Sequence, residues 1–195
     1  MTRILRYLTH PEVRIDPNVP VPDWGLSDKG EQRSLAFRHS PVLQDTGSIF
    51  SSGERKARET AAILAAELDL DVTILERSHE NDRSGTGFLE PKEFETVADQ
   101  FFATPTESVR GWERAVDAQA RIVAEARYVL AQISERDILM VGHGGVGTLL
   151  FCHLAGLDVD RKHDQPGGGG NVFAFDIEQQ SILHAWRPME SFLTA

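Results

Sequence analysis

The sequence predicts an α/β protein: one three-layer domain with a mostly parallel β-sheet, helices on both faces and a C-terminal hairpin. Short apolar segments alternate with longer amphipathic ones along the chain, as in repeated strand–helix units. The segment Asp137–Val141 is apolar after its first residue, as expected for a strand buried on both faces of a parallel sheet. Near the C-terminus, the strand-like segments Asn171–Ile177 and Ser181–Trp186 are separated by a short turn and predict the hairpin.

Length and composition suit one globular domain. The chain has 195 residues, of which 41% are hydrophobic and 26% are charged. This length is enough to bury a complete core, and no stretch has the composition of a linker. We therefore expect one domain over residues 1–195.

The first half of the sequence predicts alternating strands and helices. Arg3–Leu8 is typical of a strand that ends before Pro11, because proline has no N–H to donate to a β-ladder. Glu12–Gly25 is rich in proline and predicts a loop, and Ser27 is a suitable N-cap for the helix that follows. The other elements expected here are the strands Ser48–Ser51 and Asp71–Leu75 and the helix Glu54–Leu68.

The second half continues this alternation. The segment His79–Leu89 has no clear apolar period and predicts a loop. Helices are expected over Pro91–Phe102 and Ser108–Ser134. The buried strand Asp137–Val141 then leads into a helix over Gly144–Leu157, and the hairpin completes the domain.

Charge and cysteine content limit the function classes. The formal net charge of -10 argues against general nucleic-acid binding and against an anionic membrane surface, since both require a basic face. An acidic protein binds phosphate only where positive charge is gathered locally. The single cysteine, Cys152, excludes an intrachain disulfide and is expected in the core, because it lies in an apolar run. With no signal-like N-terminus and no run of membrane-spanning length, we expect a cytoplasmic protein.

Two histidines follow two of the expected strands. His10 follows the first strand, and His143 follows Asp137–Val141 and opens a helix. Ligands in such sheets bind beyond the carboxyl ends of the strands, so we expect these two residues at one site. The remaining histidines have no such placement and are interpreted as structural: His39, His79, His153, His163 and His184.

Glycines surround His143 in the run Gly142–Gly147. A glycine-rich turn from strand to helix lets a ligand approach the backbone. The first N–H groups of the helix, which begins at Gly144, are unpaired and suit an anion. Such turns also occur without a ligand, so this signal gains its weight from His143.

Four stretches, in this order, resemble the histidine phosphatase superfamily, also called the phosphoglycerate mutase-like fold. Leu8–Glu12 stands where the family usually has Arg-His-Gly-Glu after an apolar strand, and Gly25–Gly30 matches its Leu-Thr-x-x-Gly helix start. The two most specific stretches are Ser51–Ala61, which matches Ser-Ser-x-x-x-Arg-Ala-x-Gln-Thr-Ala, and Val141–Val146, which matches Ser-His-Gly-Gly. The resemblance runs from about residue 3 to about residue 177 and implies the same α/β fold.

The resemblance implies a role for each matching residue. In the family the first histidine takes the phosphoryl group, which makes His10 the nucleophile. His143 then neutralises the phosphoryl oxygens, and Glu80 donates a proton to the leaving oxygen, with Asp82 as the nearby alternative. A carboxyl group in that role needs a raised pKa, through burial or the charge of the phosphate. We expect no metal and no cofactor, because no metal-ligand spacing such as His-Glu-x-x-His occurs.

The sequence departs from the family at its cationic positions. Thr9 and Lys56 replace two arginines, and Pro11 replaces a glycine. Arginine grips a phosphate with two hydrogen bonds whereas lysine is a point charge, so we expect a loss of rate. Thr9 and Lys56 are still expected to contact the phosphate. Arg83, in the loop that carries Glu80, is the candidate for the missing guanidinium, and the alternative is a solvated side chain.

Two function hypotheses remain. The first is a phosphomonoester hydrolase that works through a phosphohistidine at His10 with low generic activity; a mutase is less favoured because it needs a strongly cationic pocket. The second is a phospho-ligand-binding or regulatory module that has lost turnover. Either takes a small phosphorylated substrate or a phosphoprotein. The expected walls of the site are Glu12–Trp24 and Pro166–Asn171, the latter with four glycines that predict a mobile lid, a close approach to a ligand or a flexible connection.

Overall fold

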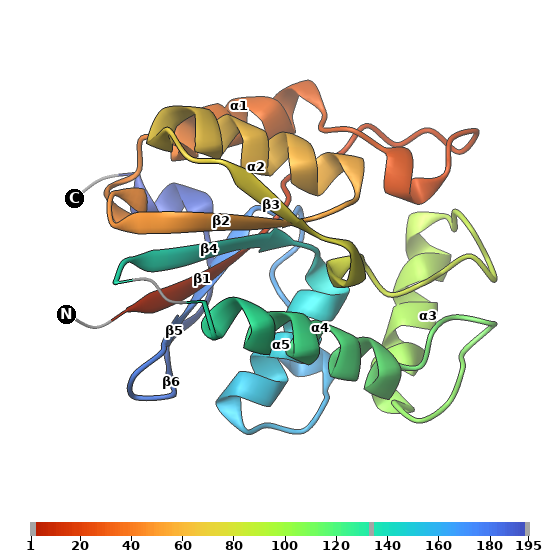
Figure 1. Cartoon of the computed structure of the whole chain (residues 1–195). Helices are drawn as coiled ribbons and strands as arrows, with labels where there is room; N and C mark the ends of the chain where they lie inside the picture. Colours follow the sequence, from red (N-terminus) through yellow and green to blue (C-terminus); the bar gives the residue numbers. More distant parts are fainter. Residues whose placement is uncertain (1–2, 133–134, 194–195) are drawn as a thin grey trace.

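A computed structural model describes residues 3–132 and 135–193 of the chain. Its sheet has six strands in the order β3-β2-β4-β1-β5-β6 (Figure 1). The strands are β1 (Ile4–Thr9), β2 (Thr46–Ser52), β3 (Val72–Leu75), β4 (Asp137–Gly142), β5 (Asn171–Asp176) and β6 (Ser181–Pro188). The helices are α1 (Asp28–Phe37), α2 (Arg55–Leu68), α3 (Pro91–Ala103), α4 (Ala115–Leu130) and α5 (Gly144–Ala155).

The first four strands form the parallel part of the sheet. β1 pairs with β4, β4 with β2, and β2 with β3, all in parallel. β5 runs antiparallel to β1, and β6 runs antiparallel to β5. The mostly parallel sheet and the C-terminal hairpin are therefore confirmed, and the carboxyl ends of β1 to β4 lie along one edge.

Helices cover both faces of the sheet, which gives the three expected layers. α1 and α2 lie on one face, and α4 and α5 lie on the other (Figure 1). Each face has its own cluster of buried apolar side chains, and neighbouring residues of β4 alternate between them. Met140 packs toward α4 and α5, while Leu139 packs toward α2. The chain thus forms a single α/β domain.

The loop between β1 and α1 closes back on itself at Ser27. The Ser27 hydroxyl accepts a hydrogen bond from Gly30 N–H at 3.1 Å, as the sequence predicts for an N-cap. Ser27 N–H donates to the carbonyl of Glu12 at 2.9 Å. A Cβ at position 30 would lie 2.2 Å from that same carbonyl oxygen, so only glycine fits where the loop meets the helix.

The expected helix Ser108–Ser134 is shorter in the structure, where α4 begins later. Arg110 and Gly111 have φ values of 52° and 82°, which a right-handed helix cannot hold. The buried Trp112 instead donates its indole N–H to a hydroxyl group in the loop that precedes α3. Ser134 lies outside the described residues. The prediction was wrong because its apolar residues belong to two segments, a packed loop and a helix.

Two expectations from composition can be compared with the fold. Cys152 is buried in α5, as expected for a core residue. Over residues 3–132 and 135–193, every helix is too short or too polar to cross a membrane.

Candidate active site

The two histidines lie side by side because β1 and β4 are neighbouring strands. Thr9 pairs with Gly142 at the ends of these strands, and the next residues are His10 and His143. His10 N–H donates to the carbonyl of Gly142 at 2.9 Å. The two imidazole centroids are 5.3 Å apart, with the ring planes at 68°. The expected meeting of the two rings at the carboxyl edge of the sheet is confirmed.

The hydrogen bonding of His10 determines which ring nitrogen is free. Nδ1 lies 2.8 Å from the carbonyl oxygen of Pro11, which can only accept, so Nδ1 carries the proton. Burial is the main cause that lowers the pKa of His10 to about 3, and the adjacent His143 ring and the Lys56 ammonium act in the same direction. The ring is therefore neutral at pH 7, and its Nε2 has an unshared electron pair, as a nucleophile requires.

His143 is held on its backbone and on its ring. The hydroxyl of Tyr7 accepts from His143 N–H at 3.0 Å and donates to the His143 carbonyl at 3.2 Å. Ser52 Oγ lies 2.8 Å from the ring Nε2, a contact that the sequence did not assign. Burial lowers the pKa of His143, so this ring is also neutral. In the part of the chain that the structure describes, its Nδ1 has no hydrogen-bond partner.

Glu80 reaches the same edge of the sheet, where it caps helix α5. Its Oε2 accepts from Gly145 N–H at 3.0 Å and its Oε1 accepts from Val146 N–H at 2.9 Å. Burial acts to raise the pKa of Glu80, but His143, Arg83 and these backbone hydrogen bonds outweigh it and lower the pKa. Burial therefore does not give Glu80 the raised pKa expected for a proton donor, because the helix N-terminus stabilises the ionised carboxylate. A pKa raised by the charge of a phosphate stays a prediction.

The expected anion site at the start of α5 is held by this carboxylate. A Cβ on Gly145 would lie 2.8 Å from Glu80 Oε1, so the contact requires a glycine. A Cβ on Gly144 would lie 2.3 Å from Gln165 Nε2. The glycines were interpreted as room for a ligand. The structure shows that they also make room for side chains of the chain itself.

A cleft of about 770 Å³ opens at His10. Glu80, Gly144 and Gly145 line it beside His10. Both expected walls contribute, the first through residues 12, 13 and 15 and the second through residues 166–169. Helix α3 and the loop after it supply much of an apolar side. The apolar residues that line the cleft include Ile15, Phe94, Ala98, Phe101, Phe102 and Trp112.

The four-glycine segment packs against the backbone of His10. Gly170 N–H donates to the His10 carbonyl at 3.0 Å, and a Cβ on Gly169 would lie 2.2 Å from the same oxygen. Arg33 donates to the carbonyls of Gly168 and Gly169 at 3.2 Å each. Of the expected roles, close backbone approach is the one that the structure shows, and the backbone approached is that of His10.

A comparison with protein families identifies the group to which this fold and histidine pair belong. The model of the histidine phosphatase superfamily (branch 1) matches residues 17–185. The chain belongs to the histidine phosphatase superfamily. The match begins after His10, so the position of His10 rests on the geometry of the site. A search of curated protein sequences gave no significant match.

Solved structures of similar fold cover nearly the whole of this histidine phosphatase. A mycobacterial glucosyl-3-phosphoglycerate phosphatase is 23% identical with a TM-score of 0.73, over 96% of this chain and 97% of its own. YhfR of Bacillus stearothermophilus is 21% identical with a TM-score of 0.78, over 94% and 95%. The phosphoserine phosphatase of Entamoeba histolytica, in complex with 3-phosphoglyceric acid, is 17% identical with a TM-score of 0.72, over 95% and 96%. These likenesses show the fold and, with the family, support a phosphatase.

Lys56 does not line the cleft of this histidine phosphatase, contrary to expectation. Its buried ammonium donates to the carboxylate of Glu54 and to the carbonyl of Val21, the latter at 2.9 Å. Glu54 Oε1 also accepts from Glu80 N–H at 2.8 Å and lies 3.7 Å from His143 Nε2. Burial acts to raise the pKa of Glu54, but His143 and Lys56 lower it to about 2. Glu54 was not predicted as a site residue, because an acidic residue at the start of a helix is common.

Thr9 is also committed to contacts within the protein. Its hydroxyl donates to Gln165 Oε1 at 2.6 Å and accepts from Asn171 N–H at 3.0 Å. The side chain is fully buried, in contrast to the expected contact with a phosphate. Gln165 itself lines the cleft and was not predicted. The hydrogen bond from Thr9 thus holds the side chain of Gln165 in place in the wall of the cleft.

Arg83 lies in the cleft with His10 and Glu80, where the sequence analysis expected it. Its guanidinium carbon is 5.1 Å from the ring centroid of Phe94 and 5.8 Å from that of Trp112. Among residues 3–132 and 135–193, no carboxylate oxygen is within ion-pair distance of Arg83. Its contact with a phosphate stays a prediction.

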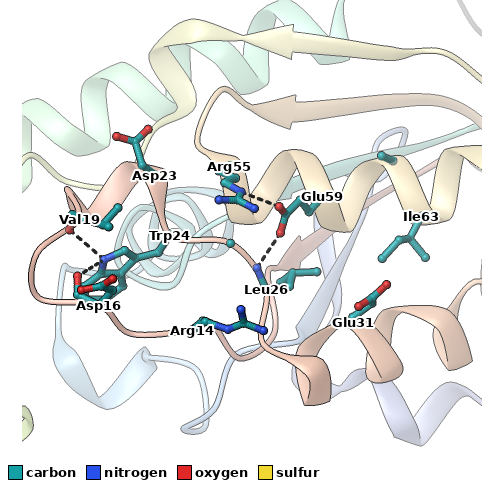
Figure 2. Close-up of a pocket in the computed structure, with 12 residues that line it drawn as sticks. Arg14, Asp16, Val19, Asp23, Trp24, Leu26, Glu31, Arg55, Glu59 and Ile63 are labelled. Carbon is teal, nitrogen blue, oxygen red and sulfur yellow. Dashed lines mark hydrogen bonds and ion pairs between the residues drawn. The ribbon is translucent and has the colours of Figure 1, made fainter.

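A second cavity, of about 530 Å³, lies between residues 14–26 and helix α2 (Figure 2). Glu59 accepts from Arg55 Nε and from Leu26 N–H, each at 2.7 Å. The indole N–H of Trp24 donates to two carbonyls of its own loop. The polar groups named here thus have hydrogen-bond partners within the protein, and none of the expected catalytic or phosphate-binding residues lines this cavity.

The side-chain geometry also bears on metal binding. Within the described ranges, residues 3–132 and 135–193, no three His, Cys, Asp or Glu side chains are grouped so as to hold a metal ion. A metal-independent reaction stays a prediction, and a chelator tests it.

Proposed function

We propose that this histidine phosphatase hydrolyses phosphate monoesters through a phosphohistidine at His10, without a metal ion. The observation that carries the proposal is the state of the His10 ring, whose Nδ1 proton is held by Pro11 while Nε2 keeps its electron pair. Arg83 lines the same cleft and supplies positive charge for the phosphoryl oxygens. His143, at 5.3 Å between ring centroids, contacts the same oxygens in this proposal.

The proposed reaction has two displacements. Nε2 of His10 attacks phosphorus with its unshared pair, and the ester P–O bond breaks with its electron pair on the leaving oxygen, which takes up a proton. Water then attacks the phosphohistidine. The P–N bond breaks, its electron pair returns to Nε2, the proton of the attacking water passes to solvent, and inorganic phosphate leaves. The covalent intermediate divides one difficult displacement into two easier ones.

We expect turnover to be slow. Phosphoryl transfer depends on stabilising the charge of the phosphoryl oxygens. Lys56 cannot contribute fully, because Glu54 neutralises it. Glu80, which the family resemblance makes the proton donor, is ionised as the cap of α5.

The test is the release of inorganic phosphate from a panel of phosphate monoesters, with and without a chelator. We expect activity that survives chelation and that His10→Ala abolishes. The matched control is His153→Ala, an exposed histidine outside the cleft, which should leave activity unchanged. Mass spectrometry of protein quenched during turnover should find a phosphoryl group on the peptide that contains His10. Undiminished turnover in His10→Ala contradicts the mechanism.

A second candidate function, a phospho-ligand-binding module without turnover, is favoured by one observation. Contacts to phosphate were expected at Lys56 and at the start of α5. In the structure, Glu54 accepts the hydrogen bond of Lys56, and Glu80 accepts those of the first N–H groups of α5. The distinguishing result is phosphate or vanadate binding by calorimetry with no hydrolysis of any ester in the panel.

We also propose a cytoplasmic location. The only cysteine, Cys152, is a buried free thiol, and a reducing compartment suits a protein of this kind. Cell fractionation with an antibody against the chain tests this.

A further inference from the structure

Gln165 is held by its amide oxygen in the wall of the cleft at His10. The Thr9 hydroxyl donates to Gln165 Oε1 at 2.6 Å, and the side-chain amide of Asn171 donates to the same oxygen at 2.9 Å. The other end of the amide, Nε2, lies against the start of α5, where a Cβ on Gly144 would be 2.3 Å from it. The side chain therefore joins the end of β1 to the start of α5.

The neighbouring groups determine which end of the Gln165 amide is the nitrogen. A carbonyl oxygen can only accept, so the Asn171 atom that lies 3.0 Å from the Pro166 carbonyl is the Asn171 amide nitrogen. That nitrogen donates, so the Gln165 atom that it contacts is the carbonyl oxygen, and the opposite end is the NH₂ group. The Thr9 hydroxyl agrees with this, because it accepts from Asn171 N–H at 3.0 Å and uses its own proton for Gln165. None of these groups titrates, so the charge of a bound phosphate leaves their donor and acceptor roles unchanged.

The NH₂ group of Gln165 has donors that the protein does not use. Within residues 3–132 and 135–193, its Nε2 has no hydrogen-bond acceptor. The atom is accessible to solvent, and Gln165 lines the cleft at His10. A donor whose orientation is already fixed can stabilise an anion without any rearrangement.

This donor group lies beside the histidine pair. Thr9, which orients the amide, directly precedes His10 in the chain. Gly144, which adjoins Nε2, directly follows His143. Thr9, where a contact with the phosphate was expected, thus directs the amide of Gln165 instead.

We propose that Gln165 binds the phosphoryl group of the substrate, with Nε2 donating to a phosphoryl oxygen while Thr9 and Asn171 hold the amide in that orientation. The inference rests on the proposed phosphatase function and adds a binding residue to its site. Negative charge is spread over the phosphoryl oxygens during transfer, so a fixed donor there stabilises the transition state as well as the bound ligand. The amide itself forms and breaks no covalent bond.

Gln165→Glu is the most direct test of this role. One oxygen of the substituted side chain still accepts from Thr9 and Asn171, whereas the NH₂ donor becomes an oxygen that can only accept. Titration calorimetry with inorganic phosphate should show an affinity about 100-fold lower, because a hydrogen bond is lost and a like charge is added. Gln100→Glu is the matched control, since it adds the same charge at an exposed position of α3 outside the cleft. Its affinity should stay within about twofold of the wild type, because exposed charges are screened.

Gln165→Leu removes the amide without adding a charge. The affinity for phosphate should fall about tenfold, the lower end of the scale for a hydrogen bond to a charged group. The value of kcat/KM for a phosphate monoester should fall at least as far. Thermal unfolding without phosphate establishes that each variant is folded.

Thr9 provides a test of the orientation. Thr9→Val removes one of the two hydrogen bonds that hold Gln165 Oε1, so the affinity for phosphate should fall about threefold. Thr9→Ser keeps the hydroxyl and should bind phosphate more tightly than Thr9→Val. Equal affinities of these two variants would contradict the positioning role of Thr9.

The results separate this inference from the proposed function. If either Gln165→Leu or Gln165→Glu binds phosphate as tightly as the wild type, Gln165 is not a donor to the phosphate. Hydrolysis that is lost in His10→Ala then still retains the phosphatase. Failure of the wild type to bind phosphate or vanadate also overturns the role of Gln165. Weaker phosphate binding by both variants of a protein that hydrolyses no ester overturns the phosphatase and retains Gln165 as a phosphate-binding residue.

Discussion

Lys56 and Arg83, two cations beside the histidine pair, are held in opposite ways. Lys56 is buried, and the carboxylate of Glu54 binds its ammonium two residues away in the sequence. Arg83 is partly exposed and stacks on the rings of Phe94 and Trp112. One cation is neutralised by the chain itself, and the other keeps its charge toward the cleft.

From this difference we expect that the number of cations near a pocket does not by itself set the affinity of the pocket for anions. A buried charge is stable only with a partner, and the partner then competes with any ligand for the same hydrogen bonds. Arginine on aromatic faces needs no such partner, because the ring quadrupole stabilises it and its N–H groups remain available at the edge. We therefore expect Arg83 to contribute most to phosphate binding and Lys56 to contribute little.

The largest expected effect comes from removing the carboxylate of the Glu54–Lys56 ion pair. Glu54→Gln leaves the ammonium of Lys56 buried without its counter-charge, which should lower the free energy of unfolding by about 3–5 kcal/mol. Phosphate then has a cation to neutralise, so it should raise the melting temperature of the variant more than that of the wild type. Thermal unfolding with and without phosphate measures both.

The double variant Glu54→Gln with Lys56→Met is the control for that experiment. It removes both charges, so it should recover most of the lost stability and should not gain from phosphate. If Glu54→Gln unfolds at the same temperature as the wild type, Glu54 does not compensate the buried charge of Lys56.

The second expected effect is at Arg83. Arg83→Ala should weaken phosphate or vanadate binding by about 1.5–3 kcal/mol, the scale of a hydrogen bond to a charged group. Lys56→Met should weaken it by about 0.7 kcal/mol or less, since that charge is already paired. Titration calorimetry of the three proteins gives the comparison directly.

Arg110→Ala is the matched control for Arg83, because Arg110 is exposed and pairs with Glu93 outside the cleft. If wild type and Arg83→Ala bind phosphate with equal affinity, Arg83 does not contact the phosphate and only packs on the rings of Phe94 and Trp112. An arginine at Thr9 should not rescue the variant, since Thr9 is fully buried and its hydroxyl is bonded on both sides.

The same contrast explains how much of the site could be predicted from the sequence. His10 and His143 could be placed because each directly follows a strand, and neighbouring parallel strands end at one edge. The start of α5 was interpreted as a site for a ligand anion, and its N–H groups instead bind a carboxylate of the chain itself. The sequence could not reveal that the anion is Glu80, because the contact joins residues 66 positions apart. The partner of Lys56 was equally hidden, because the sequence does not show that both side chains are buried.

The smallest expected effect tests whether the charge at Lys56, although paired, still acts on the histidine pair. Burial, His143 and Lys56 lower the pKa of His10 to about 3, whereas an unfolded histidine has a pKa of about 6.5. Below pH 6.5, His10 therefore takes up a proton in the unfolded chain but stays unprotonated in the folded protein. The wild type should lose stability through this residue as the pH falls from about 6.5 toward 3.

His10→Gln removes that contribution, so its stability relative to the wild type should improve on going from pH 7.5 to pH 5, by about 1–2 kcal/mol. His153→Gln, at an exposed position, is the control and should follow the wild type at both values. Urea unfolding at the two pH values measures the difference.

A titration of His10 by NMR then measures the contribution of Lys56 alone. In Lys56→Met the pKa of His10 should rise, because one of the charges that lower this pKa has been removed. An unchanged pKa in that variant would mean that Glu54 screens Lys56 from the histidines as completely as it does from a ligand.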